Sequence, residues 1–271
     1  MRAIFASITS GERSGEAPRF VVAGLEALGS FKNHNYWGIA SQQEDRGFKT
    51  QREVGYFKVG IDIPLSDMAI GHLRWAVMKG PTIHNTHPLD GCLVTPARRS
   101  RIVLAHNGTV SEVEKAHKPT LEKQGHHFNT DVASEALVHY IERQMQNQRL
   151  LNGHYQLDQQ DAADQAFISG ALEVFSFFGK SGGTVVAAHG ETLVAANLGT
   201  LPLVVARYSN SFLISSEPMA LLDMYRRRDY DGFPDKGALI ERGQTAVINR
   251  LELKVYATHS KTPLEYQIQP L

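Results

Sequence analysis

The chain has 271 residues, a length that fits either two small domains or one large layered domain at about 150 residues per domain. Its 28 basic and 28 acidic side chains cancel, so no net field attracts a polyanion or an anionic membrane surface, and neither nucleic acid nor membrane is an expected partner. A hydrophobic content of 42% with 21% charged residues is ordinary for a globular protein, and no apolar run approaches the roughly eighteen residues of a membrane span. These values exclude disorder, collagen-like repeats and insertion into a bilayer.

The cysteine content and the N-terminal sequence indicate the cellular compartment of the protein. Cys92 is the one cysteine of the sequence and therefore has no partner for an intrachain disulfide. The first residues, Met-Arg-Ala-Ile-Phe, lack the long apolar segment of a secretory signal. Both features predict a cytoplasmic location.

The first part of the chain alternates short apolar runs with one helical pattern. Runs of strand length that are bounded by turn residues predict strands at residues 3–8, 37–40, 68–75 and 102–105. Between the first two, apolar residues from Phe20 to Leu28 recur at helical spacing and stop at Gly29, which predicts a helix.

Helices dominate the middle of the chain and strands its last third. Apolar residues between 136 and 145 recur at steps of three and four, with Asp131 placed as N-cap or first-turn acid, and a second amphipathic stretch covers 161–177. Short β-rich runs follow at residues 184–188, 192–196, 203–206, 212–215, 245–248 and 253–256. The polar stretches 41–52 and 226–236 are predicted to be surface connections. Two strand groups around a helical middle, without a Gly-rich phosphate loop, favour an α+β sandwich of layers in a single domain spanning 1–271.

Four short segments carry most of the candidate site residues. They read Gly71-His72-Leu73-Arg74-Trp75-Ala76, Asn85-Thr86-His87-Pro88, His106-Asn107-Gly108 and Thr130-Asp131. Each alone also fits a purely structural role: a half-buried strand edge, a tight turn or a helix cap.

Taken together and in this order, the four segments resemble the glutaminase domain of class II glutamine amidotransferases. The resemblance is closest to the glucosamine-fructose-6-phosphate aminotransferase branch, which reads Gly-His-Thr-Arg-Trp-Ala-Thr-His-Gly, Asn-Ala-His-Pro, His-Asn-Gly and then an Asp that opens a helix. Weaker similarity at residues 36–40, 182–186 and 210–216 extends it over nearly the whole chain. The resemblance implies the four-layer αββα sandwich of N-terminal-nucleophile hydrolases, an α+β fold.

The resemblance also implies roles for four residues. Arg74 would clamp the α-carboxylate of glutamine through its planar fork, and Asp131 would pair with the α-ammonium group. Asn107 and the backbone N–H of Gly108 would form the oxyanion hole for a tetrahedral intermediate. The ligand would be glutamine or a related small molecule, and the resemblance implies no cofactor and no metal.

The loop after Arg74 departs from the family pattern. Trp75 matches the aminosugar branch, where purine-pathway amidotransferases carry Tyr, and His87 matches the Asn-Ala-His-Pro motif, so both are counted as substrate-binding positions. Val77 and Met78 stand where the family has Thr and His, which hold the substrate carboxylate. Each lost hydrogen bond to a charged group is worth roughly 1.5–3 kcal/mol, so glutamine affinity is expected to drop sharply.

The nucleophile position departs further. The family uses an N-terminal cysteine whose own α-amino group is the base, whereas this chain has Arg2 followed by Ala3. A guanidinium group stays protonated and cannot attack a carboxamide. A bulky residue at position 2 also disfavours removal of Met1. We therefore expect loss of glutamine hydrolysis and a binding protein that acts as a regulatory or structural subunit.

Other functions remain open at this point. The chain could be an active glutaminase subunit that delivers ammonia to a separate synthase or isomerase subunit, as in aminosugar synthesis, or a sensor that binds an amino acid through Arg74 and Asp131. Full-length members of the family continue into two sugar-isomerase domains, which we do not expect here.

Two further features lie outside the family pattern. Residues 89–101 form an insertion that is predicted to be a solvated surface loop, and Cys92 within it is a weak candidate for a relocated nucleophile because it has no evident base partner. The pairs His84 with His87 and His126 with His127 are expected at surface turns, not in a metal site, since no Cys or carboxylate at helical spacing completes a ligand set. His72 is predicted to be a core histidine.

Overall fold

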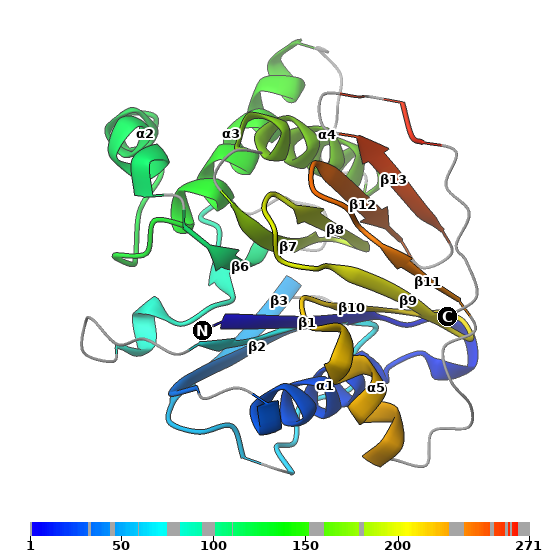
Figure 1. The fold of residues 1–271 in the computed structure, drawn as a ribbon. Coiled ribbons are helices and arrows are strands. Elements are labelled where there is room, and N and C mark those ends of the chain that lie inside the picture. Colours follow the sequence, from blue (N-terminus) through cyan, green and yellow to red (C-terminus); the bar gives the residue numbers. More distant parts are fainter. Residues whose placement is uncertain are drawn as a thin grey trace.

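The fold consists of two antiparallel sheets stacked face to face, with helices on both outer sides (Figure 1). This computed structural model describes residues 2–31, 34–43, 47–58, 60–74, 82–93, 101–109, 111–151, 160–178, 182–227, 236–249, 252–257, 260 and 262–264. The four layers confirm the predicted α+β αββα sandwich.

The first sheet has seven strands and contains the N-terminal strand near its middle. Its order is β11 (Lys236–Leu239), β9 (Val204–Tyr208), β10 (Ser211–Ser215), β1 (Arg2–Ile8), β4 (Met68–Arg74), β2 (Tyr36–Gln43) and β3 (Gly47–Val54). Helices α1 (Ala17–Phe31) and α5 (Pro218–Arg227) cover its outer face (Figure 1).

The second sheet has six strands. Its order is β13 (Leu253–Ala257), β12 (Gln244–Ile248), β8 (Thr192–Asn197), β7 (Gly183–His189), β6 (Val103–Gly108) and β5 (Leu89–Asp90). Helices α3 (Glu135–Leu151) and α4 (Gln160–Phe178) cover its outer face, and α2 (Ser111–Lys123) packs against α3. Two 3₁₀ turns, η1 (Gly11–Arg13) and η2 (Ile83–Asn85), complete the elements.

The alternation of side chains along β1 explains how this strand contributes to two layers of the core. Ala3 and Phe5 pack against α1, whereas Ile4 and Ile8 pack between the two sheets. Successive side chains of a strand point to opposite faces, so β1 is buried on both sides and is apolar throughout after Arg2, apart from Ser7. Arg2 points to the same face as Ile4, toward the second sheet.

Several expectations about local structure are corrected. Residues 41–52 are not a surface connection, because β2 continues to Gln43 and β3 follows as an edge strand whose alternate residues face solvent. The helices α2 and α5 were not predicted. Helix α3 begins at Glu135, so Asp131 lies four residues before it and is neither N-cap nor first-turn acid; Glu135 is the first-turn acid. Among the described residues, no helix is both long and apolar enough to cross a bilayer.

Candidate functional site

The predicted site residues of the first sheet, Arg2 and Arg74, lie side by side at the ends of two neighbouring strands. Arg2 of β1 and Arg74 of β4 are directly opposite each other, and Tyr36 of β2 is opposite Arg74 on its other side. Residues in register on antiparallel strands present their side chains to the same face. Both arginines therefore face the second sheet.

Asn107 and Gly108 are the last residues of β6 in the second sheet, and they lie next to Arg2. The Asn107 side-chain Nδ2 donates a hydrogen bond to the backbone oxygen of Arg2 at 2.8 Å, and Arg2 Nη1 donates to the backbone oxygen of Gly108. Arg2 thus contacts both residues that the sequence predicted for the oxyanion hole.

The two guanidinium groups lie in an environment that disfavours their charge. Burial and the nearby charge of Arg74 lower the pKa of Arg2, and burial lowers the pKa of Arg74. Among the residues that the structure describes, no carboxylate pairs with either arginine, and Arg74 Nε is buried without a hydrogen-bond partner. The arrangement therefore favours an anion at this position.

Asn85 joins Arg74 to Asp131. Arg74 Nη1 donates to the backbone oxygen of Asn85 at 2.8 Å, and the backbone N–H of Asp131 donates to Asn85 Oδ1 at 3.1 Å. Asn85 sits in η2, so this short turn brings the predicted carboxylate-binding and ammonium-binding residues to one neighbourhood. The side chain of Asp131 is exposed to solvent.

The segment that carries Asp131 is fixed by the buried carboxylate of Glu135. Its oxygens accept hydrogen bonds from the N–H groups of Asn129 at 2.7 Å and Thr130 at 2.8 Å, and from the Thr130 hydroxyl at 2.7 Å. Burial raises the pKa of Glu135, but the nearby His139 imidazole and the hydrogen bonds from Asn129 and Thr130 outweigh this effect, so the net pKa is lowered.

Three buried histidines support the strand ends beneath the site. The rings of His72 and His87 stack with centroids 4.7 Å apart, and the backbone N–H of His106 donates to His87 Nδ1 at 3.1 Å. Desolvation lowers the pKa of His72 and His87 well below the ordinary value, and it lowers the pKa of His106 to about 4. His72 is the core histidine expected, but the prediction of a surface position for His87 is wrong. Its ring is fully buried and supports the backbone from below the site.

The remaining predicted loop residues are not placed. Trp75, Val77 and Met78 lie outside the described residues, so their substrate-binding role stays a prediction.

A cluster that sequence reasoning missed surrounds Cys92. Its Sγ lies 3.4 Å from His126 Nδ1, 3.7 Å from His139 Nδ1 and 3.3 Å from Glu142 Oε2. The predictions that His126 lies at a surface turn and that Cys92 has no partner are therefore wrong. Only the His139 and Glu142 spacing on one helix was visible in the sequence, because the other two members come from distant segments.

The described start of the 89–101 insertion is correspondingly not a solvated loop. Leu89 and Gly91 are buried, and the Gly91 N–H donates to the oxygen of Ile102 at 2.8 Å. Ile102 precedes Asn107 by five residues, which is about 16 Å along a strand. Cys92 is thus at the far end of β6 and cannot act as a nucleophile at Asn107 and Gly108.

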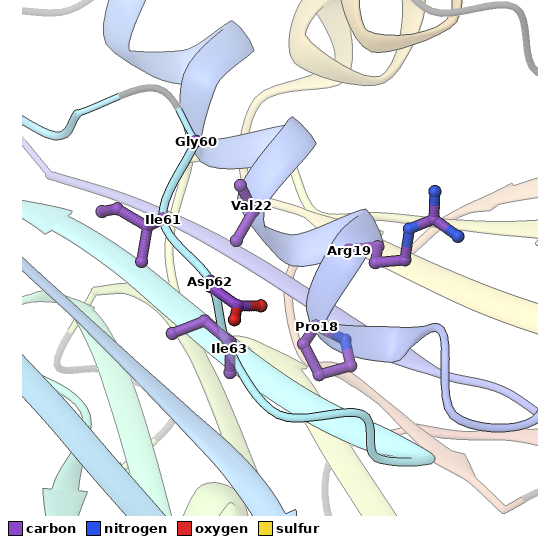
Figure 2. A pocket seen from close by; sticks show the side chains of 7 residues that line it. All are labelled: Pro18, Arg19, Val22, Gly60, Ile61, Asp62 and Ile63. Carbon is purple, nitrogen blue, oxygen red and sulfur yellow. The ribbon is translucent and has the colours of Figure 1, made fainter.

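One surface pocket lies away from these residues. It has a volume of about 230 Å³ between α1 and the segment 60–63, on the outer side of the first sheet (Figure 2). Val22 and Asp62 point into the space between helix and segment, whereas Arg19 extends away from it (Figure 2). No side chain of the predicted site takes part in it.

Comparison with solved structures defines the class of fold. The chain is similar to glutamine phosphoribosylpyrophosphate amidotransferase from B. subtilis, with a TM-score of 0.70 and 21% identity over 96% of this chain and 50% of that one. It is also similar to a predicted glutamine amidotransferase from Pseudomonas aeruginosa, with a TM-score of 0.51 and 16% identity over 93% of this chain and 94% of that one. The fold is that of the class II glutamine amidotransferases.

Curated sequences similar to this chain include aminotransferases of aminosugar synthesis. The chain is 28% identical over 243 residues to the glutamine–fructose-6-phosphate aminotransferase (isomerizing) of Idiomarina loihiensis, covering 87% of this chain and 34% of the relative. For the enzyme of the same name from Brucella abortus the identity is 27% over 260 residues, covering 93% and 36%. The chain spans about a third of the length of these relatives. No family model matches it. The resemblance that the motifs predicted is confirmed.

Proposed function

We propose that this chain is a class II glutamine amidotransferase domain that does not hydrolyse glutamine and acts as a regulatory or structural subunit. The observation that carries the proposal is the position of Arg2. It opens β1 where the resembled family has its cysteine, and its guanidinium group is bonded to Gly108 while its backbone oxygen is bonded to Asn107.

The chemistry of Arg2 supports this proposal in two ways. Burial lowers the pKa of Arg2, but a guanidinium group offers donors and no lone pair for attack on a carboxamide carbon. Its side chain also fills the space beside Gly108, which a thiol and a substrate carboxamide would share. An oxyanion hole without a nucleophile has no tetrahedral intermediate to stabilise.

The same arrangement supports retention of an anionic ligand. Two half-buried guanidinium groups face one site, and Asp131 lies nearby through Asn85. A small carboxylate, such as an amino acid, would relieve the repulsion between Arg2 and Arg74. The partner in this proposal is a separate synthase or isomerase subunit. Binding of the ligand to this chain would change the activity of that subunit.

A glutaminase assay tests the proposal directly. Pure protein at millimolar glutamine is expected to release neither glutamate nor ammonia above background. Turnover that survives Cys92→Ala would contradict the proposal and support the alternative, an active subunit that supplies ammonia to a synthase. Turnover abolished by Cys92→Ala would also contradict it and would identify a nucleophile elsewhere.

Calorimetry tests the ligand. Glutamine is expected to bind more weakly than micromolar, because Val77 and Met78 replace two hydrogen-bonding residues. Micromolar binding of glutamine would show that affinity has been kept.

A further inference from the structure

Four side chains from three segments of the chain converge on one point beside α3. Cys92 follows β5, His126 follows α2, and His139 and Glu142 lie three residues apart on α3. One ligand atom of each lies within 4.8 Å of all the others. The cluster is separate from the Arg2 and Arg74 site, at the opposite end of β6.

The separations fit the corners of a tetrahedron. Zinc binds sulfur at about 2.3 Å and nitrogen or oxygen at about 2.0–2.2 Å, so tetrahedral ligand atoms stand about 3.3–3.6 Å apart. Cys92 Sγ lies 3.4 and 3.7 Å from the two imidazole Nδ1 atoms and 3.3 Å from Glu142 Oε2. Glu142 Oε2 lies 3.2 Å from His126 Nδ1 and 2.8 Å from His139 Nδ1. Most of these separations need little adjustment to admit a central ion.

Burial makes a counter-charge necessary. The side chains of His139 and Glu142 are 0% exposed and that of His126 is 3% exposed. A buried carboxylate is costly unless it is paired or coordinates a metal, and Glu142 Oε2 lies within ion-pair distance of both imidazoles. Without a metal, a protonated imidazole supplies the counter-charge, and a bound cation would take over this role. A divalent cation with one thiolate, one carboxylate and two neutral imidazoles gives a net charge of zero.

The surroundings orient the four ligands. Glu142 Oε1 accepts the backbone N–H of Leu93 at 2.6 Å, which leaves Oε2 for the cluster. His139 Nε2 lies 3.7 Å from Glu135 Oε1, so this carboxylate stands behind the imidazole, on the side where carboxylates commonly orient metal-binding histidines. Residue 91 is glycine where a Cβ atom would overlap the Glu142 carboxylate, so its backbone can approach the cluster.

We propose that Cys92, His126, His139 and Glu142 form a zinc site. A thiolate and two imidazoles favour zinc over calcium or magnesium, which take oxygen ligands. Four protein ligands close the coordination sphere, as in structural zinc sites. The metal ties β5, the end of α2 and α3 together, and through Glu135 it braces the segment that presents Asp131.

Metal analysis of the purified full chain is the first test. After dialysis the protein is expected to retain about one zinc ion per chain. The fine structure of its X-ray absorption spectrum should show one sulfur ligand and three nitrogen or oxygen ligands. Cobalt(II) added to chelator-treated protein should give the intense visible bands of a tetrahedral site together with a thiolate charge-transfer band. These two measurements use the wild-type chain and do not depend on the folding of any variant.

Variants provide the second test. Cys92→Ser and His139→Gln are expected to lower zinc affinity by more than 100-fold. Glu135→Gln, which reaches the four ligands through His139, is expected to lower it by about 10- to 100-fold. The matched control is His127→Gln, because His127 adjoins His126 in the sequence but is exposed. It should bind zinc as the wild type does.

Three results would overturn the proposal. The first is that the wild type takes up no zinc at micromolar free metal. The second is that the cobalt spectrum lacks the thiolate band. The third is that Cys92→Ser and His139→Gln bind zinc as tightly as His127→Gln does.

Discussion

Arg2 and Arg74 stand directly opposite each other on β1 and β4, and both side chains face the same site between the sheets. Like charges in this relation destabilise an antiparallel pair. The Arg2 guanidinium is held by Gly108 and that of Arg74 by Asn85, each through a neutral backbone oxygen. The pair therefore links the stability of the fold to anions.

We expect small carboxylate or sulfate anions to raise the thermal midpoint of the wild type more than chloride at equal ionic strength. An anion present at 100 times its Kd stabilises by about 2.7 kcal/mol. Arg2→Gln and Arg74→Gln should each remove most of this difference, because a single guanidinium group holds the anion less well. Arg19→Gln is the control, since Arg19 is exposed on α1. Equal anion effects in all four proteins would refute the linkage.

If the proposed loss of the nucleophile is right, Arg2→Cys is expected to restore a reactive thiol at this position. The substitution places a thiol beside Asn107 and Gly108 and removes the charge that occupies the site. A glutamine-mimicking electrophile should then label the new thiol, which mass spectrometry of peptides distinguishes from Cys92. A folded variant that stays unlabelled would show that the loop carrying Val77 and Met78 has also disabled the site.

The buried histidines predict acid sensitivity. His72, His87 and His106 have lowered pKa values in the folded state, with His106 at about 4, whereas an unfolded histidine titrates near 6.5. The unfolded state therefore binds more protons as the pH falls below about 6.5, and for His106 the resulting loss of stability continues down to about pH 4. Each histidine contributes up to about 1.4 kcal/mol per pH unit.

Denaturant unfolding between pH 7.5 and 5 measures this dependence. His106→Asn should flatten it, because one of the three groups no longer titrates, whereas the exposed His84→Asn should leave it unchanged. An equally steep loss in His106→Asn would assign the acid sensitivity to other groups.

Neighbouring glycines offer a test of the backbone at Asn107 and Gly108, the positions predicted for an oxyanion hole. Gly183 has φ of +106°, and a Cβ atom there would overlap the Asn107 oxygen and come within 2.7 Å of Gly108 Cα. Gly182 has φ of +76° with no atom within 4 Å of such a Cβ. Gly182→Ala should cost about 1–2 kcal/mol from strain alone, and Gly183→Ala at least about 2 kcal/mol more. Equal free energies of unfolding for the two variants would contradict the close packing of β6 on β7.

Local pattern was enough to predict most of the strands and the layered class. The apolar runs that became β1, β4, β6, β7 and β8 are short, and they are bounded by turn residues. Burial on both faces requires such runs. The edge strand β3 was missed because one of its faces is polar. Helix α2 was missed because its residues 116–123 are mostly exposed or half-buried and its sequence contains Pro119.

The sequence by itself also carries the prediction that glutamine hydrolysis is absent, since no arrangement of the chain turns Arg2 into a nucleophile. Only the tertiary structure decided what Arg2 does instead, because its opposition to Arg74 depends on the pairing of β1 with β4, and its bond to Gly108 depends on the packing of two sheets. The same holds for the Cys92 cluster. The other three members of the cluster are 34 to 50 residues from Cys92 along the chain. Helical and strand spacing in a sequence relates only residues of the same helix or strand. Long-range sheet and helix packing brings such residues together.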